Sequence, residues 1–227
     1  MADETARLVA ALRATLDADA SARASAEDFL AVRSTEDGFL LRALEVASSE
    51  SFDAMTRQSA AVTFKNAVRK HWDPVEPDEV GAVKPRGTSE GEKAQCRTAM
   101  VGLMLRAPKL VAAQLSEALS IVCAVDFPER WEGLLPELVQ RMGSAGNRDL
   151  RDVAGVLTTA SAMFKRYRGA TKTEELYKEL KYVLDTFAKP LLELTLELSA
   201  GLEANVGNVE ASRQLLTCLR LACRVFF

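Results

Sequence analysis

The chain has 227 residues, of which 48% are hydrophobic and 27% charged, so it holds enough apolar material for a folded core. Its formal net charge of −3 argues against general nucleic-acid binding, which needs a positive field. No apolar run is long enough to span a bilayer, and the N-terminal residues lack the order of a signal peptide. We therefore expect an intracellular protein without membrane insertion.

Composition also favours helix and gives little support for chemistry. Aromatic residues make up 6% of the chain, and the apolar set is rich in Leu and Ala rather than in strand-forming residues. The four cysteines lie in apolar helical patterns, and the single histidine, His71, has no second ligand at a useful spacing. With no phosphate-binding loop or nucleophile–base pair in view, we expect no metal, no cofactor and no enzyme activity.

Apolar residues at helical spacing predict four helices in the first third of the chain. The first covers the N-terminal residues, the second starts near Ser21, the third begins at Phe39, and the fourth occupies residues 54–72. The residues that we assign to their apolar stripes are Leu8, Val9, Leu12, Leu16, Ala26, Phe29, Leu30, Phe39, Leu40, Ala43, Leu44, Ala47, Met55, Val62, Phe64 and Val68.

Residues 73–91 interrupt this pattern with three prolines and three glycines. Proline removes a backbone donor and glycine weakens a helix, so a regular helix cannot continue through this stretch. We expect a long surface loop here, which in a folded chain is either functional or disordered.

Helical periodicity returns at about Glu92 and continues for the rest of the chain. One helix runs to Arg106 and another starts after Pro108, while Asp126-Phe127-Pro128 resembles a helix start with a buried Trp131 behind it. After a turn at residues 143–147, further stripes occupy residues 150–167 and 173–198, and a last helix begins near Val209. Pro190 lies inside the second of these stripes and should kink it.

The helices are similar in length, number about ten, and are mostly joined by short turns, which is typical of consecutive antiparallel pairs. We therefore predict an all-α fold, an α-solenoid of about five HEAT-type pairs in a right-handed superhelical arch. The last helix is still apolar at Phe227, and from this we expect the native protein to continue beyond it.

Several segments resemble the importin-β superfamily, in particular the exportins that return importin-α to the cytoplasm. The superfamily-level segments are Arg23-x-x-Ala26-Glu27-x-Phe29-Leu30 and Asp126-Phe127-Pro128-x-x-Trp131. Those that resemble the importin-α exporters are residues 60–66, 69–72, 103–105, 114–122, 155–157, 164–168 and 183–191. One departure is that the family's Asp-Arg-x-x-Ile-Lys is replaced by Glu92-Lys93-x-x-Cys96-Arg97.

The resemblance implies one HEAT arch over residues 1–227, with an importin-β N-terminal domain at about 23–106 and exportin-type repeats at about 107–227. It implies that the inner surface binds the small GTPase Ran in its GTP form, that importin-α is the cargo, and that nucleoporins are a further class of partner. Such a receptor shuttles between nucleus and cytoplasm and contributes no catalytic group.

The first candidate contacts to Ran lie on the predicted helix 54–72. Lys65 and Asn66 follow the core residue Phe64, and a rotation of about 100° per residue brings at least one of them toward the inner surface. Arg69 and Lys70 extend the same basic helix end. The alternative is structural: Asn66 bonds a neighbouring helix, Lys65 is solvated, and the last two cations interact with the helix dipole.

Two further candidates lie elsewhere in the chain. Arg23 is spaced four residues before Glu27, which suits either an ion pair on a helix surface or a contact to Ran. Lys165, Arg166 and Arg168 place three charges in four residues and could receive an acidic surface of Ran or of importin-α. The alternative for this cluster is a solvated helix end.

Two other functions remain open at this point. The superfamily motifs allow an import receptor of the same family, and the helical pattern allows a HEAT scaffold with no GTPase partner.

Overall fold

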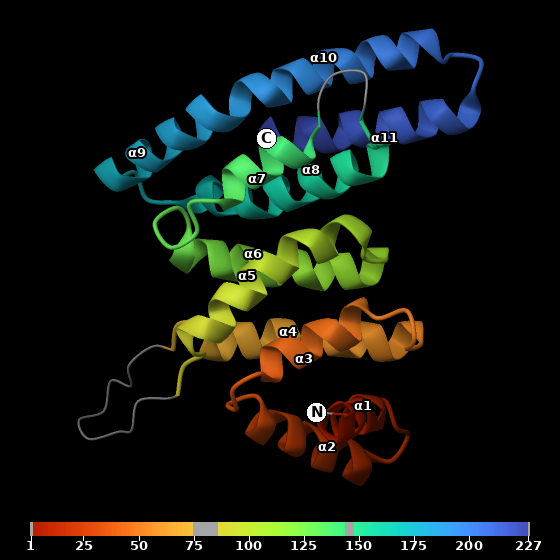
Figure 1. Ribbon diagram of the computed structural model, residues 1–227, viewed down its shortest axis with the longest axis vertical. Coiled ribbons are helices and arrows are strands. Elements are labelled where there is room, and N and C mark those ends of the chain that lie inside the picture. The colour runs from red at the N-terminus through yellow and green to blue at the C-terminus, as the bar shows by residue number, and fades with distance from the viewer. Residues whose placement is uncertain (1, 75–85, 144–147, 227) are drawn as a thin grey trace. The chain divides into compact units, whose positions relative to one another are not determined.

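The computed structural model describes residues 2–74, 86–143 and 148–226, and in these ranges all regular structure is helical (Figure 1). The chain forms two compact units. Unit 1 comprises Met1–Leu103 and Ala107–Val125, and unit 2 comprises Met104–Arg106 and Asp126–Phe227. Each unit is described by itself below.

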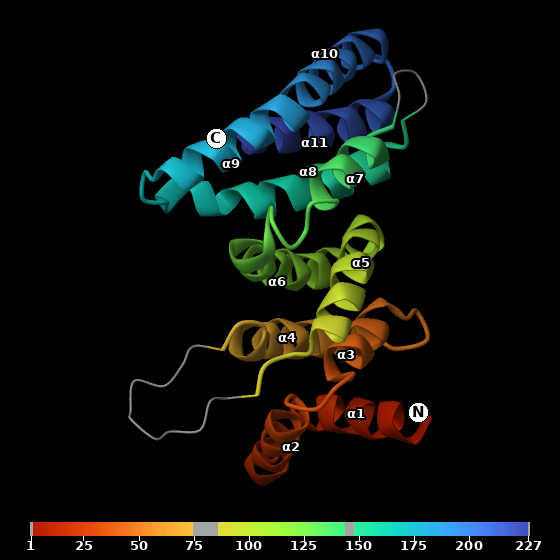
Figure 2. The same cartoon turned by 60° about the vertical axis from the view of Figure 1, so that its left-hand side comes forward.

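Unit 1 is built from helices, and most of the connections between them are short. Its helices are α1 (Ala2–Ala14), α2 (Ala20–Arg33), α3 (Phe39–Ser48), α4 (Ala54–His71), α5 (Glu90–Arg106) and α6 (Lys109–Asp126), the last residues of α5 and α6 belonging to unit 2. Figures 1 and 2 show α3 lying along α4, and α1 contacts both α2 and α4. The hairpin formed by α3 and α4 has the antiparallel pairing that the sequence predicts.

Side chains cap the N-termini of these helices in two ways. Asp19, Asp53 and Ser89 cap α2, α4 and α5 locally, each accepting a hydrogen bond from a first-turn amide. By contrast, α3 starts after Gly38, which has no side chain and a φ of 80°. The backbone amides at the start of α3 are capped by a residue of α5. The buried carboxylate of Glu92 accepts hydrogen bonds from the backbone N–H of Gly38 at 2.9 Å and of Leu40 at 2.8 Å.

The core of unit 1 contains most of the residues predicted for it, including Leu12, Leu44 and Phe64. Four assignments are wrong: Leu16, Phe29 and Met55 are 50%, 37% and 64% exposed, and Val62 is partly exposed. The buried residues of α4, among them Ala60, Phe64 and Val68, follow each other in steps of four, and Met55 lies off that stripe. Apolar character alone did not identify the inward face.

Unit 2 contains α7 (Leu134–Arg141), α8 (Leu150–Phe164), the short 3-10 helix η1 (Lys165–Gly169), α9 (Glu174–Val183), a π-helical turn η2 (Leu184–Ala188), α10 (Lys189–Ala204) and α11 (Val209–Phe226). Helix α11 packs against both α8 and α10, and α7 packs against α8 (Figures 1 and 2). The long helix predicted from Thr173 is therefore divided by η2. Pro190 has no N–H to donate to the carbonyl of Thr186, so the α-helical ladder cannot run unbroken there.

The predicted helix start at Asp126 is wrong. Asp126 is the last residue of α6, its carbonyl accepts from the amide of Arg130 at 2.7 Å, and α7 does not begin until Leu134. Phe127 precedes a proline and is disfavoured from helical geometry, which explains why α6 ends here. Trp131 is 8% exposed and so is buried as expected.

Two other predictions fall largely outside the described residues, because the loop at 73–91 includes residues 75–85 and the turn at 143–147 includes residues 144–147. The described ends of the first stretch meet: Thr88 donates to the carbonyl of His71 through its amide at 2.9 Å and through its hydroxyl at 3.2 Å.

Among the described helices, none is both long and apolar enough to cross a bilayer.

Candidate functional site

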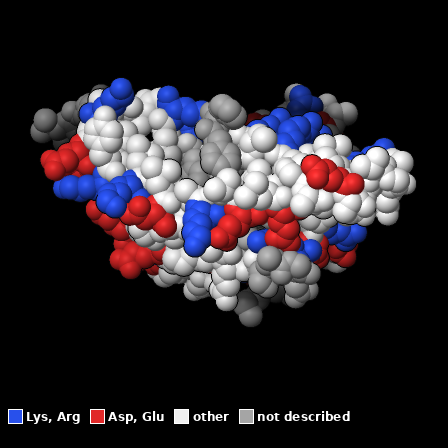
Figure 3. Space-filling model, turned by 90° about the horizontal axis from the view of Figure 1, so that it is seen from above, with Lys and Arg blue, Asp and Glu red and all other residues white. Residues whose placement is uncertain are grey.

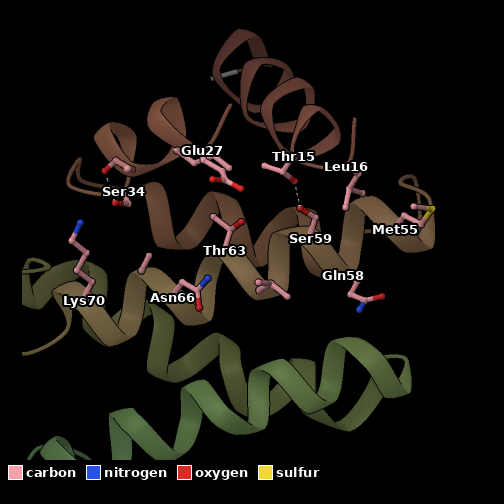
Figure 4. Close-up of a pocket in the computed structure, with 14 residues that line it drawn as sticks. Thr15, Leu16, Glu27, Ser34, Met55, Gln58, Ser59, Thr63, Asn66 and Lys70 are labelled. Atoms are coloured by element: carbon pink, nitrogen blue, oxygen red, sulfur yellow. Dashed lines mark hydrogen bonds between the residues drawn. The ribbon is translucent and has the colours of Figure 1, made fainter. Parts of the chain in front are cut away.

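An open groove lies in unit 1 between α2 and α4, with the end of α1 closing one side (Figure 4). We call it the α2–α4 groove. Its volume is about 580 Å³, and α4 supplies most of its lining. The lining residues are Thr15, Leu16, Glu27, Leu30, Ala31, Ser34, Met55, Gln58, Ser59, Val62, Thr63, Asn66, Ala67 and Lys70. A groove of this size and openness suits side chains of another protein better than an enclosed small molecule.

The groove is apolar at one end and cationic at the other. Leu16 and Met55 lie near each other at one end, and Lys70 lies at the opposite end of the same face of α4 (Figure 4). Asn66 precedes Lys70 by one turn, and Glu27 projects from α2 on the facing wall. A partner segment would therefore meet different chemistry along its length, which fixes the direction in which it can bind.

Polar groups in the middle of the groove are held in place by unit 1 itself. The hydroxyl of Ser59 lies 3.3 Å from that of Thr15 and donates to the carbonyl of Leu12 at 3.2 Å. In contrast, the side chains of Glu27, Gln58, Asn66 and Lys70 have no hydrogen-bond or ion-pair partner in the part of the chain that the structure describes. The polar groups of these four side chains can therefore form hydrogen bonds or ion pairs with a partner that enters the groove.

His71 joins α2 to α4 behind this groove. The hydroxyl of Ser34 donates to the carbonyl of Ala31 at 2.7 Å, so it must accept from His71, whose Nε2 lies 3.1 Å away. This assigns the proton to Nε2. Burial, and next the charge of Lys70, lower the pKa of His71 below its ordinary value. The ring is a neutral structural link, and the described residues hold no cluster of metal ligands.

The four candidates on α4 divide between two faces. Asn66 and Lys70 line the α2–α4 groove, whereas Lys65 and Arg69 lie on the neighbouring face of the helix. Lys65 is partly buried, and the guanidinium of Arg69 lies 3.4 Å from the carboxylate of Glu117 on α6. Exposed pairs of this kind hold their partners weakly, so Arg69 could exchange Glu117 for an acidic group of a partner.

Arg23 is placed differently from what its sequence spacing predicts. Its guanidinium donates to the carbonyls of Asp17 and Ala18, both at 2.8 Å, and so closes the connection between α1 and α2. The predicted ion pair with Glu27 is wrong, because the carbonyls that follow α1 lie within reach and Glu27 points into the groove (Figure 4). Arg23 therefore positions the groove wall rather than forming part of it.

In unit 2, the predicted cationic cluster separates into buried and exposed members. The side chain of Arg166 is 17% exposed, forms an ion pair with Glu179, and lies over the rings of Phe127 and Tyr167 at 5.3 Å and 5.0 Å. Lys165 and Arg168 are exposed. Arg166 thus holds η1 against α9 and the segment after α6, and the remaining two cations are the ones that a partner can reach.

Sequence reasoning missed the apolar end of the groove and Gln58. Leu16 and Met55 were assigned to the core because they are large and apolar, yet both lie outside the buried stripes. A signal was present on α4, because the steps of four through Ala60, Phe64 and Val68 leave Met55, Gln58 and Val62 on another face. Glu27 was recognised only as a member of an ion pair that does not form.

On the one face that Figure 3 shows, charged side chains of a single sign do not form a continuous field. On the face shown in Figure 3, Lys and Arg side chains occur in separate groups, with groups of Asp and Glu between them. This distribution suits contacts with the mixed charge of a protein surface, whereas a nucleic-acid backbone requires a continuous basic track.

Comparison with known families gives the class of protein. The Importin-beta N-terminal domain family matches residues 26–106, which include α3, α4 and α5 and nearly all of the groove's lining. The Cse1 family matches residues 163–227, which include η1 and α11. Over the residues that these two models match, the chain is similar to proteins of the importin-β family.

Within that family the chain is homologous to Exportin-2. It is 38% identical to Exportin-2 of Oreochromis niloticus and 36% identical to that of Homo sapiens, in each case over 219 residues and 95% of this chain. Exportin-2 of Drosophila melanogaster is 33% identical over 220 residues. The chain spans about a fifth of the length of these relatives, 21% in each case.

A solved structure supports the same assignment. The exportin Cse1 in its cargo-free, cytoplasmic state superposes with a TM-score of 0.86 at 30% sequence identity, covering 98% of this chain and 23% of Cse1. The two chains are therefore similar in sequence as well as in fold. The prediction of an all-α HEAT-repeat solenoid is confirmed.

Proposed function

We propose that this chain functions as part of a nuclear export receptor that binds Ran-GTP and takes part in returning importin-α from the nucleus to the cytoplasm. The observation that supports this most strongly is the homology with Exportin-2 over 95% of the chain. In this proposal the protein shuttles between the two compartments, meets nucleoporins on the way, and contributes no catalytic group.

Ran would bind at the α2–α4 groove and the adjacent basic face of α4. Lys70 and Asn66 have no partner in the described part of unit 1, and a charge-assisted bond from Lys70 to a carboxylate of Ran would offset the loss of its hydration. Leu16 and Met55 would cover an apolar side chain at the other end. Lys65 and Arg69 would contact the rim, where charges mainly increase the rate of association.

The experiment is a pull-down with the purified chain and Ran loaded either with GDP or with a non-hydrolysable GTP analogue. We expect retention of the GTP-analogue form and loss of the GDP form. Equal retention of both nucleotide states would defeat the proposal.

Charge reversal at the groove tests the proposed contact. Because Lys70 would face a carboxylate, Lys70→Glu should weaken binding of the GTP-analogue form by at least about tenfold, measured by titration calorimetry. Lys109→Glu is the matched control, since Lys109 is exposed on α6 in the same unit and does not line the groove. Equal losses in both variants would indicate a general charge effect and remove Lys70 from the site.

Two other functions make different predictions. An import receptor would release importin-α when Ran-GTP binds, whereas an export receptor would bind both together, and this comparison requires the longer protein. A HEAT scaffold without a GTPase partner would retain neither form of Ran while remaining folded. The relatives' name, Exportin-2, favours the export function over both.

A further inference from the structure

Helix α11 presents a row of arginines on the face that points away from its own unit. Its buried residues include Leu215, Cys218 and Ala222. At about 100° per residue, Arg213, Arg220 and Arg224 lie on the opposite side of the helix. All three are exposed, and they span about 17 Å along the helix axis at 1.5 Å per residue.

These arginines have no acidic partner in the described part of the chain. The guanidinium groups of Arg213, Arg220 and Arg224 make no hydrogen bond or ion pair there, and the carboxylate of Glu210 accepts instead from the amide of Gln214 at 3.2 Å. Several other exposed cations of unit 2 differ, among them Lys178 and Lys181, which pair with acids one turn away. A row of uncompensated arginines is therefore a particular feature of α11 in a chain whose net charge is −3.

A fourth arginine and an apolar pocket adjoin the end of this row. Arg168 of η1 donates from Nη2 to the carbonyl of Arg224 at 3.2 Å, which joins η1 to the last turn of α11. Between them opens a pocket of about 360 Å³ in which Arg168 and Arg224 accompany mainly apolar side chains. The larger of those apolar side chains include Phe164, Leu180, Val183, Leu184, Phe187 and Leu191.

We propose that this surface, formed by Arg168, Arg213, Arg220, Arg224 and the adjacent pocket, docks an acidic segment of a partner protein that carries one large apolar residue. The apolar residue enters the pocket, and carboxylates further along the segment meet the arginines. An extended segment rises about 3.3 Å per residue, so about five residues match the row on α11. Guanidinium groups bind carboxylates in a bidentate manner, which adds direction to the contact.

The pocket is the reason for choosing a protein segment over a nucleic acid. A phosphate backbone would satisfy the arginines but has no aliphatic side chain to fill an aliphatic and aromatic pocket. Exposed Val209 and Leu216 flank the arginine row and would also remain uncovered by phosphates. An acidic segment with an apolar anchor covers both features. The inference concerns unit 2 only and does not depend on Ran binding at unit 1.

The test uses fluorescence anisotropy with the 227-residue chain and a dye-labelled synthetic peptide of about twelve residues, rich in Glu with a single Leu. We expect saturable binding that weakens as NaCl is raised, because exposed ion pairs are screened. A peptide with Gln in place of Glu should not bind, and one with Ser in place of Leu should bind more weakly. Equal binding of the Leu and Ser peptides would overturn the role of the pocket.

Matched double variants test the position of the site. An exposed ion pair contributes a few-fold in affinity and reversal adds repulsion, so Arg213→Glu/Arg220→Glu should weaken binding by more than about tenfold. Arg151→Glu/Lys172→Glu reverses the same number of exposed charges elsewhere in unit 2 and should change binding less than about twofold. Circular dichroism checks that both variants fold.

Three results would overturn the proposal. Equal weakening by the two double variants would mean that net charge alone drives binding. Tighter binding of a single-stranded oligonucleotide of similar charge, lost in Arg213→Glu/Arg220→Glu, would assign the surface to nucleic acid. No binding of the Glu-rich peptide at low salt by the folded chain would mean that the surface does not dock acidic segments.

Discussion

Glu92 shows how one side chain can organise two helices. It lies in α5, yet its carboxylate accepts from the amides that start α3, where Gly38 provides no side chain. The position is also a departure from the related exportins, which by resemblance carry Asp there. Like Asp, Glu92 carries a carboxylate, and in this chain that carboxylate caps α3.

Removing this carboxylate should destabilise unit 1. Glu92→Ala leaves the buried amide of Leu40 and the partly buried amide of Gly38 without an acceptor, and we expect a loss of about 1–3 kcal/mol in the free energy of unfolding. Urea denaturation followed by circular dichroism measures it. Glu45→Ala, on the exposed side of α3 and without a side-chain partner in the described residues, is the control and should cost less than about 1 kcal/mol. Similar losses in both variants would contradict the role of Glu92.

His71 gives unit 1 a defined response to acid. Because its pKa is lowered from 6.5 in the folded state, the unfolded chain binds the proton more readily. The stabilisation is thus complete above pH 6.5 and is lost as the pH falls through the lower, folded-state pKa. Asp53, whose pKa is lowered from 3.8 to about 2 chiefly by the amide and hydroxyl of Thr56, titrates below this window.

We therefore expect the melting temperature of the wild-type chain to fall between pH 7.5 and pH 5.5 by more than that of His71→Gln. The glutamine amide can still donate to Ser34 but does not titrate. Differential scanning calorimetry at several pH values measures the difference. Parallel curves for the two proteins would show that His71 does not carry the response.

At the scale of the element, α8 depends on a glycine where it meets the end of α5. A Cβ built on Gly155 would lie 2.6 Å from the Cα of Leu105, a distance that a backbone atom cannot relieve by a rotamer change. Gly155→Ala should thus cost about 1–3 kcal/mol in the free energy of unfolding, measured by urea denaturation. Gly102→Ala in α5 meets nothing within 4 Å and should be neutral or stabilising by up to about 1 kcal/mol. The reverse order would contradict the close approach of α8 to Leu105.

Helix positions were largely predictable from sequence, because leucine and alanine stripes with short turns leave few alternatives to paired helices. Faces were harder. On α4 a face of Met55, Gln58 and Asn66 runs beside the buried one, and apolar content does not separate them. The role of Arg166 was hidden for another reason: its partner Glu179 is thirteen residues away, and only tertiary structure brings the two together.

At the scale of the whole molecule, the chain is 21% of the length of its Exportin-2 relatives. The family resemblance implies that such receptors contact Ran from more than one part of the solenoid. We expect the isolated chain to bind Ran loaded with a GTP analogue more weakly than a full-length Exportin-2 does, since it forms fewer of the contacts. Surface plasmon resonance with both proteins measures this. Equal affinities would place the whole Ran contact within these residues.

The two hydrogen bonds from Thr88 to His71 have a consequence for the tolerance of this chain to insertion. They join the carbonyl of the last residue of α4 to Thr88, two residues before α5, so both ends of this connection are fixed within the folded part of unit 1. In general, the entropic cost of closing a loop rises by only about 0.6 kcal/mol for each doubling of its length. Epitope tags or reporter sequences inserted between those positions should therefore leave α4 and α5 in register.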